Sequence, residues 1–237
     1  MNGSDVTAAV ESERATRLDR LGSQQSLLAL TDARLDRQTV LLEAAAAESV
    51  AEETFRVWAK TEGTEPAREA FASVAETEAD HTTRVLAQLD GDSDPDIDST
   101  PDALHEFLRG LDNTAARIGA GLIGRPLVAD RTALQVINFF VNEADERRAD
   151  LFRDLRTDTR ETRTEGEALL DALYDGSTDG DDKVDGEDGE DGERGANGAS
   201  EEGHEWARES AIEAVEIAYE EYAETLEEMG LDPRPIC

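Results

Sequence analysis

The segment from Ala67 to Leu89 has the pattern of an amphipathic helix, and two ionisable residues interrupt its apolar face. At helical spacing, one stripe contains Ala67, Phe71, Val74, Glu78, His81, Val85 and Leu89. Burying a carboxylate and an imidazole without partners would cost several kcal/mol of folding free energy. The sequence therefore predicts that this helix packs against a partner for both groups, which is either a metal ion or a second acidic helix.

The rest of the chain shows the same 3.6-residue periodicity, and strand signals are scarce, so we predict an all-α fold. Cap residues, first-turn prolines and terminal glycines set the expected ends of the helices. The predicted helices cover residues 6–21, 31–62, 64–90, 100–124, 128–156 or on to 174, and 204–229.

Composition divides the chain into four parts. Residues 1–30 hold the N-terminal helix, and residues 31–174 are expected to form the helical core. Residues 175–203 are rich in Gly, Asp and Glu and predict a disordered linker. Residues 204–237 carry a helix with a 3-4-3-4 apolar stripe, which either docks on the core or serves as a dimerisation or partner helix at the end of a tether.

The chain has a formal net charge of -34, with 57 acidic residues against 23 lysines and arginines. Self-repulsion of this size would loosen a compact domain in dilute buffer, whereas concentrated salt would screen it. We interpret the composition as that of a salt-adapted cytosolic protein of the kind that halophiles make, with an acidic partner or tail as the alternative. Nucleic acid is not an expected partner because no basic patch is present.

The only cysteine is Cys237, so neither an intramolecular disulfide nor a Cys-x-x-Cys metal site can form. This indicates a reducing compartment. Residues 1–5 have no basic or apolar targeting pattern, and no apolar run is as long as a membrane span. We therefore expect a cytoplasmic protein without a membrane segment.

Other helices also carry charged residues on or near their apolar stripes. Glu48 interrupts the stripe of the helix over 31–62 as Glu78 interrupts the next one. Asp112 lies at the edge of the stripe of the helix over 100–124. Asp145 and Arg148 fall within the apolar arc of the helix over 128–156.

A lone Glu on one helix followed by Glu-x-x-His on the next resembles the rubrerythrin branch of the ferritin-like proteins. The resemblance rests on Ala47-Glu48-Ser49, Ala51, Phe55, Ala59, Glu62-Gly63, Phe71, Ala75, Glu78, His81 and Arg84. It implies a ferritin-like four-helix bundle, to which this chain adds an N-terminal helix and a tethered C-terminal helix. It also implies iron as the cofactor, with Glu48, Glu78 and His81 as ligands. Family members include peroxide reductases and iron-oxidising proteins.

The second half of the chain departs from the family pattern, which expects a second Glu-x-x-His. Asp145 stands at the glutamate position and Arg148 at the histidine position, while Asp112 is the nearest acid to the position expected on the third helix. Asp145 and Asp112 are candidates to complete the iron ligands. We hypothesise that the permanent charge of Arg148 replaces a second iron, which leaves a mononuclear site or none. The rubredoxin module needs four cysteines and is absent.

Two functions follow from these patterns. The first is a ferritin-like protein with a degenerate iron site, active in iron binding or in defence against peroxide and oxygen. The alternative is a non-enzymatic helical protein that has lost its metal, keeps a buried polar network and binds a partner through its last helix. Of the other histidines, His105 and His204 are predicted to be solvated.

Overall fold

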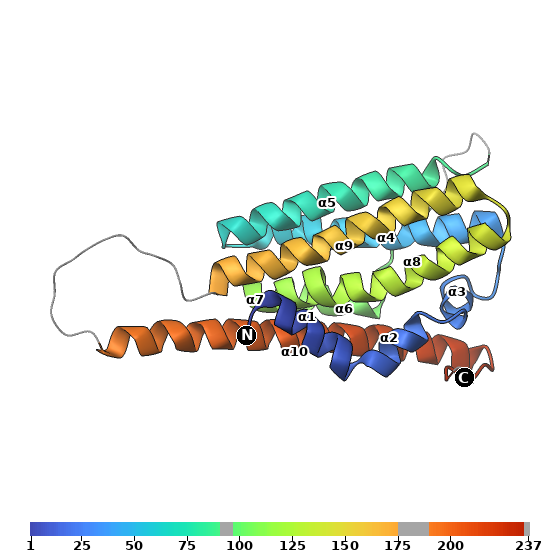
Figure 1. Cartoon of the computed structure of the whole chain (residues 1–237). Helices are drawn as coiled ribbons and strands as arrows, with labels where there is room; N and C mark the ends of the chain where they lie inside the picture. The colour runs from blue at the N-terminus through green and yellow to red at the C-terminus, as the bar shows by residue number, and fades with distance from the viewer. Residues whose placement is uncertain (91–96, 175–189, 235–237) are drawn as a thin grey trace.

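The structure, a computed structural model, describes residues 1–90, 97–174 and 190–234, and within these ranges it is helical with no β-strand (Figure 1). The predicted all-α class is confirmed for this part of the chain. The elements are α1 (Gly3–Glu13), α2 (Ala15–Leu21), α3 (Gln25–Leu30), α4 (Arg37–Thr61), α5 (Glu65–Leu86), α6 (Ala103–Gly110), α7 (Thr114–Arg117), the π-helical η1 (Ile118–Gly124), α8 (Arg125–Asn142), α9 (Glu146–Tyr174) and α10 (Glu190–Glu228).

Two helical hairpins form the centre of the fold (Figure 1). Helices α4 and α5 pack along each other, and α8 packs along α9. The segment that joins the two hairpins contains α6. Helices α5 and α9 are in contact, so the two hairpins share one interior. Helix α10 runs along the other side of the second hairpin, and α1 and α2 pack against α10.

The start of α4 lies later in the chain than the sequence predicted. Asp32 and Ala33 adopt positive φ angles of 49° and 57°, which interrupts the helix expected from residue 31. Asp36 then caps α4, because its Oδ1 accepts a hydrogen bond from the Thr39 N–H at 3.0 Å. The N-terminal segment differs too, since the predicted helix over 6–21 is divided at Arg14 into α1 and α2.

The single helix predicted over residues 100–124 is wrong in two respects: the helix breaks after residue 110, and the helix that follows the break does not end at residue 124. Helix α6 ends at Gly110, Leu111 is extended, and Asn113 caps a new helix by accepting from the Ala116 N–H at 3.0 Å. This new helix passes through η1, where the Arg125 N–H bonds to a carbonyl five residues back. It continues past Pro126 to the end of α8, so Gly124-Arg-Pro126 is not a stop.

The predicted helix over 128–156 is two helices. Ala144 has a φ of 55°, and the chain reverses between α8 and α9. Asp145 directly precedes α9 and caps it, because its Oδ1 accepts a hydrogen bond from the Arg148 N–H at 3.2 Å. The i, i+3 spacing of Asp145 and Arg148 is therefore that of a helix start. It does not place both side chains on an inward stripe.

The last helix docks on the bundle. Its apolar stripe is buried at Ile212, Val215, Tyr222 and Leu226. Of the predicted linker over 175–203, residues 175–189 lie outside the described residues, and the chain is helical from residue 190. Cys237 also lies outside them. In the described part of the chain, no helix is long and apolar enough to cross a membrane.

Gly119 in η1 makes the close approach of α10 possible, and replacing it with alanine should destabilise the protein. An added Cβ would overlap the backbone of Ala207 in α10. We expect Gly119→Ala to lower the free energy of unfolding by about 1–3 kcal/mol, because overpacking outweighs the gain in helix propensity. Urea unfolding followed by circular dichroism measures it. Gly110→Ala is the matched control, since nothing lies within 4 Å of a Cβ there, and an equal loss in both variants would contradict the packing argument.

The buried hydrophobic residues form two clusters. The first fills one end of the α4–α5 hairpin and extends along the faces of α1, α2 and α10 that pack on the bundle, and the second fills the other end of the hairpins. The first contains Phe55, Trp58 and Phe71, and the second contains Phe140 and Phe152. Between these clusters, α4 and α5 carry several buried or partly buried polar residues, among them Glu48, Glu78 and His81. A polar layer therefore separates the two clusters within this hairpin, and the candidate site lies in it.

Candidate metal centre

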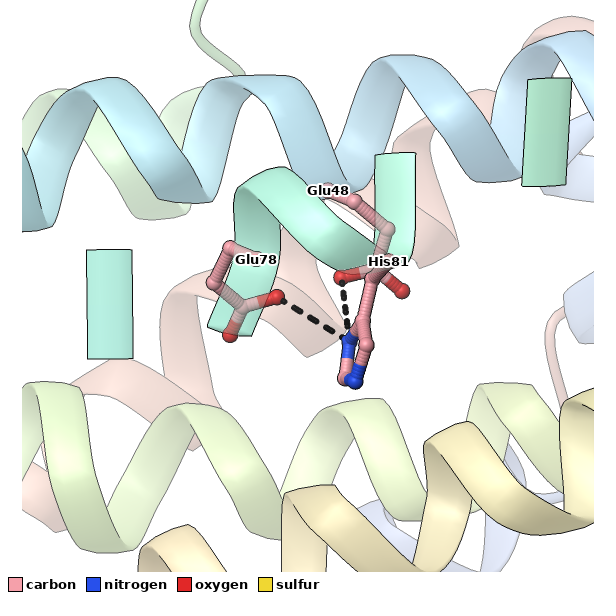
Figure 2. Close-up of side chains that lie close together, drawn as sticks. All are labelled: Glu48, Glu78 and His81. Carbon is pink, nitrogen blue, oxygen red and sulfur yellow. Dashed lines mark ion pairs between the residues drawn. The ribbon is translucent and has the colours of Figure 1, made fainter. Parts of the chain in front are cut away.

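The polar layer contains a cluster of Glu48, Glu78 and His81 (Figure 2). Glu48 comes from α4, while Glu78 and His81 lie one turn apart on α5. His81 Nδ1 is 3.6 Å from Glu78 Oε2 and 3.8 Å from Glu48 Oε2. One donor atom from each residue lies within 4.8 Å of the other two, so this group could hold a metal ion.

Two donor atoms of the cluster are buried without a hydrogen bond. Glu78 is 4% exposed and His81 2% exposed, and neither Glu78 Oε2 nor His81 Nδ1 makes a hydrogen bond. When His81 is protonated, the two atoms form an ion pair. Their separation of 3.6 Å is too long for a hydrogen bond. Two ligands of one tetrahedral ion, each about 2.1 Å from it, lie about 3.4 Å apart. The geometry suits a shared ion better than a direct bond between the two side chains.

Asp158 on α9 orients the His81 ring. Its Oδ2 lies 3.0 Å from His81 Nε2, and a carboxylate can only accept, so Nε2 carries the hydrogen. In the neutral ring this leaves the lone pair on Nδ1, which faces the two glutamates. A carboxylate behind the distal ring nitrogen is the usual support of a metal-bound histidine.

Arg125, the first residue of α8, supplies a fixed positive charge. Its Nη1 donates to Glu78 Oε1 at 2.8 Å, and its Nη2 lies 3.8 Å from Glu48 Oε2. The guanidinium also lies over the Phe55 ring, 5.6 Å from its centroid. Because arginine stays protonated in proteins, this side of the cluster is positive at every relevant pH.

The charges of the cluster are strongly coupled. Burial, together with the charge of Glu78, raises the pKa of Glu48 to about 7. Burial alone would raise the pKa of Glu78, but the positive charges of Arg125 and His81 outweigh it and lower that pKa. Burial would likewise lower the pKa of His81, but Glu48 and Glu78 raise it to about 10. Without a metal, a protonated His81 and Arg125 therefore balance the two carboxylates.

Two carboxylates and one imidazole form a mixed donor set. Imidazole suits iron and zinc, and carboxylate suits manganese and harder ions, so the set fits a divalent transition ion such as Fe²⁺, Mn²⁺ or Zn²⁺. Three protein ligands leave at least one coordination position open. Glu48 keeps 23% of its side chain exposed, and the exposed part lines a pocket.

The structure does not bring the other predicted residues to this cluster. Arg148 pairs with Asp145 Oδ2 at 2.5 Å and donates to the Gln88 carbonyl at 2.6 Å. Asp112 is exposed in the connection between α6 and α7. The arginine beside the cluster is Arg125, so the assignment of this role to Arg148 is corrected. The error arises because the helix breaks between α8 and α9, so the residues after the break do not continue the helical phase of the residues before it.

Sequence reasoning missed Arg125 and Asp158, although a signal exists for each. Arg125 is the next position on the stripe of Ile118 and Leu122 once the helix is continued past Gly124. Asp158 follows Leu155 by three residues and precedes the buried Thr162 by four. His105 and His204 were predicted to be solvated, but both are buried, at 4% and 2% exposure.

Comparison of the chain with protein families, curated proteins and solved structures finds no match.

Proposed function

We propose that this protein is a ferritin-like helical bundle that binds a single divalent transition-metal ion through Glu48, Glu78 and His81. The observation that carries the proposal is a pair of buried potential ligand atoms, Glu78 Oε2 and His81 Nδ1, which face each other at 3.6 Å and make no hydrogen bond. Leaving such atoms unsatisfied costs about 1–3 kcal/mol each. A bound ion would satisfy both at once.

The arrangement of the helices supports the ferritin-like assignment. In such bundles two helical hairpins are joined by one long crossover, and ligands project inward from facing helices. Here α4 and α5 form the first hairpin, and the helix of α7, η1 and α8 forms the second with α9. The crossover includes α6. The candidate ligands come from the first hairpin, as the resemblance to rubrerythrins implies.

A single ion is proposed because Arg125 contributes a positive charge to the same two glutamates. A second dication would have to share Glu48 and Glu78 with a guanidinium that lies 2.8 Å from one and 3.8 Å from the other. Two unit charges about 5 Å apart repel by about 3 kcal/mol at an effective dielectric constant of 20, and a dication doubles this. Arg125 thus takes the role that the sequence hypothesis gave to Arg148.

Iron(II), if it is the ion bound, would supply reactivity toward oxygen or peroxide at its open positions. The residues of the chain would hold it and set its surroundings. Asp158 keeps the proton on His81 Nε2, Arg125 fixes Glu78, and the hydrophobic clusters on both sides limit the access of water. We propose iron binding or defence against peroxide and oxygen as the biological role.

The test is a titration of the full-length, chelator-treated protein in concentrated salt with Mn²⁺, Zn²⁺ and anaerobic Fe²⁺. We expect one tight equivalent per chain by calorimetry and by metal analysis. His81→Ala should abolish it, while His204→Ala, which removes an equally buried histidine paired with Asp171, should retain it. Two tight equivalents would contradict the role of Arg125. No binding would overturn the proposal and favour the alternative of a metal-free polar network.

A further inference from the structure

A pocket of about 190 Å³ lies next to the cluster, between α4, α6, α8 and α9. Its walls are mostly apolar, with Ala44, Val136, Phe152 and Leu155 among the lining residues. An apolar cavity of about 150 Å³ is large enough to hold benzene. The pocket therefore fits a molecule of about one ring with a small substituent.

His105 gives this pocket a specific polar group. The residue lines the pocket and is 4% exposed. Its Nδ1 is 2.7 Å from Asp102 Oδ1, and its Nε2 is buried with no hydrogen-bond partner. Because the Asp102 carboxylate can only accept, the hydrogen of the neutral ring lies on Nδ1. Nε2 is then a buried acceptor, which costs free energy until a donor reaches it.

The charged residues of the pocket argue against an anionic ligand. Arg125 is already paired with Glu78 at 2.8 Å, and Arg156 makes two hydrogen bonds to the Asp130 carboxylate, at 3.0 and 3.1 Å. The remaining charges that line the pocket, Glu48 and Asp102, are acidic. A carboxylate placed here would meet like charges and no unengaged cation. A neutral hydroxyl group can instead donate to His105 without adding charge.

We propose that this pocket binds a small neutral molecule, with an apolar body of about one ring and one hydroxyl group that donates to His105 Nε2. A molecule held there lies beside Glu48, at the edge of the proposed metal centre. The proposal does not depend on the metal, since the walls and the acceptor belong to the chain alone. Its test is therefore made in the presence of a chelator, and its failure would leave the metal proposal intact.

The experiment follows the ¹⁹F signal of 4-fluorophenol during titration with the full-length protein, with fluorobenzene and 4-fluorobenzoate as comparisons. We expect saturable binding of the phenol, about tenfold tighter than fluorobenzene, the ratio that one net hydrogen bond provides. The benzoate should bind more weakly than the phenol. Absence of phenol binding, or a preference for the benzoate, would overturn the proposal.

Variants locate the ligand. Ala133→Leu and Ala47→Leu each fill the pocket from a different helix, and both should abolish binding. His105→Phe should remove the preference for phenol over fluorobenzene, whereas His204→Phe, a buried histidine outside the pocket, should keep it. Circular dichroism confirms that each variant is folded. Unchanged binding in both filled variants, or an unchanged preference in His105→Phe, would overturn the assignment.

Discussion

Replacing Arg125 with methionine should lower the free energy of unfolding of the metal-free protein by about 3–5 kcal/mol. The Arg125 side chain is 8% exposed, and its guanidinium donates to Glu78 Oε1 at 2.8 Å. Methionine has a similar length but no charge, so the variant leaves a buried carboxylate without its permanent cation. Urea unfolding in the presence of a chelator measures the loss. A loss below about 1 kcal/mol would contradict the role that we assign to this residue.

A divalent ion should recover part of this loss, because it brings positive charge to the same carboxylates and stabilises the folded state by mass action. Arg148→Met is the matched control. Arg148 is similarly buried, at 9% side-chain exposure, and pairs with Asp145 at 2.5 Å. Arg148→Met should also lower the free energy of unfolding, but the ion should stabilise this variant no more than it stabilises the wild type. Equal recovery in both variants would contradict the placement of the metal beside Glu78.

The metal-free protein should lose several kcal/mol of stability as the pH rises from about 5 to 10. The pKa of His81 is raised from 6.5 to about 10, so the folded state holds this proton more tightly than the unfolded chain. The stability that it contributes is fully present below pH 6.5 and is lost as the pH rises toward 10. Glu48 acts with the same sign between pH 4.5 and about 7, because its pKa is also raised.

The lowered pKa of Glu78 acts in the opposite direction, but only at pH values below 4.5, outside this window. Free energies of unfolding at pH 5.5, 7.5 and 9.5, measured with a chelator in constant high salt, test the prediction. His81→Gln keeps a polar side chain of similar size and removes the titration. Its stability should fall less between pH 7.5 and 9.5 than that of the wild type, and the remaining slope belongs to Glu48, whose pKa rises further once His81 is removed. The same slope in the variant and in the wild type would show that His81 is not the group responsible.

The half of the site on α4 and α5 could be predicted because each of these helices is long and regular. Glu48 and Glu78 interrupt clean apolar stripes, and the i, i+3 spacing of Glu78 and His81 fixes one face whatever the exact helix ends are. An error of six residues at the start of α4 did not change the face on which Glu48 lies. Periodicity within one unbroken helix is robust to its boundaries.

The other half could not be predicted because it depends on where helices break. Ala144 is not a residue that signals a positive φ, yet it ends α8 and turns Asp145 and Arg148 into a helix start. Conversely, the sequence Gly124-Arg-Pro126 reads as a stop, but the helix passes through it. In both cases the observed backbone differs from what the local sequence favours. As a result, the arginine beside the candidate ligands was predicted to be Arg148, whereas it is Arg125 in α8.

The π-helical segment η1 ends directly before Arg125. Such a segment holds one residue more than an α-helix of the same span. Deleting one residue between Ile118 and Gly124 should restore α-helical hydrogen bonding there and leave the helix on each side in its present phase, because the π-helical turn absorbs the residue that is removed. The Arg125 guanidinium should then keep its contact with Glu78. A one-residue deletion later in α8 has no such turn to absorb it and would rotate the residues beyond it by about 100°. The π-helical turn therefore makes the charge opposite the candidate ligands tolerant of a change in the length of the chain before it.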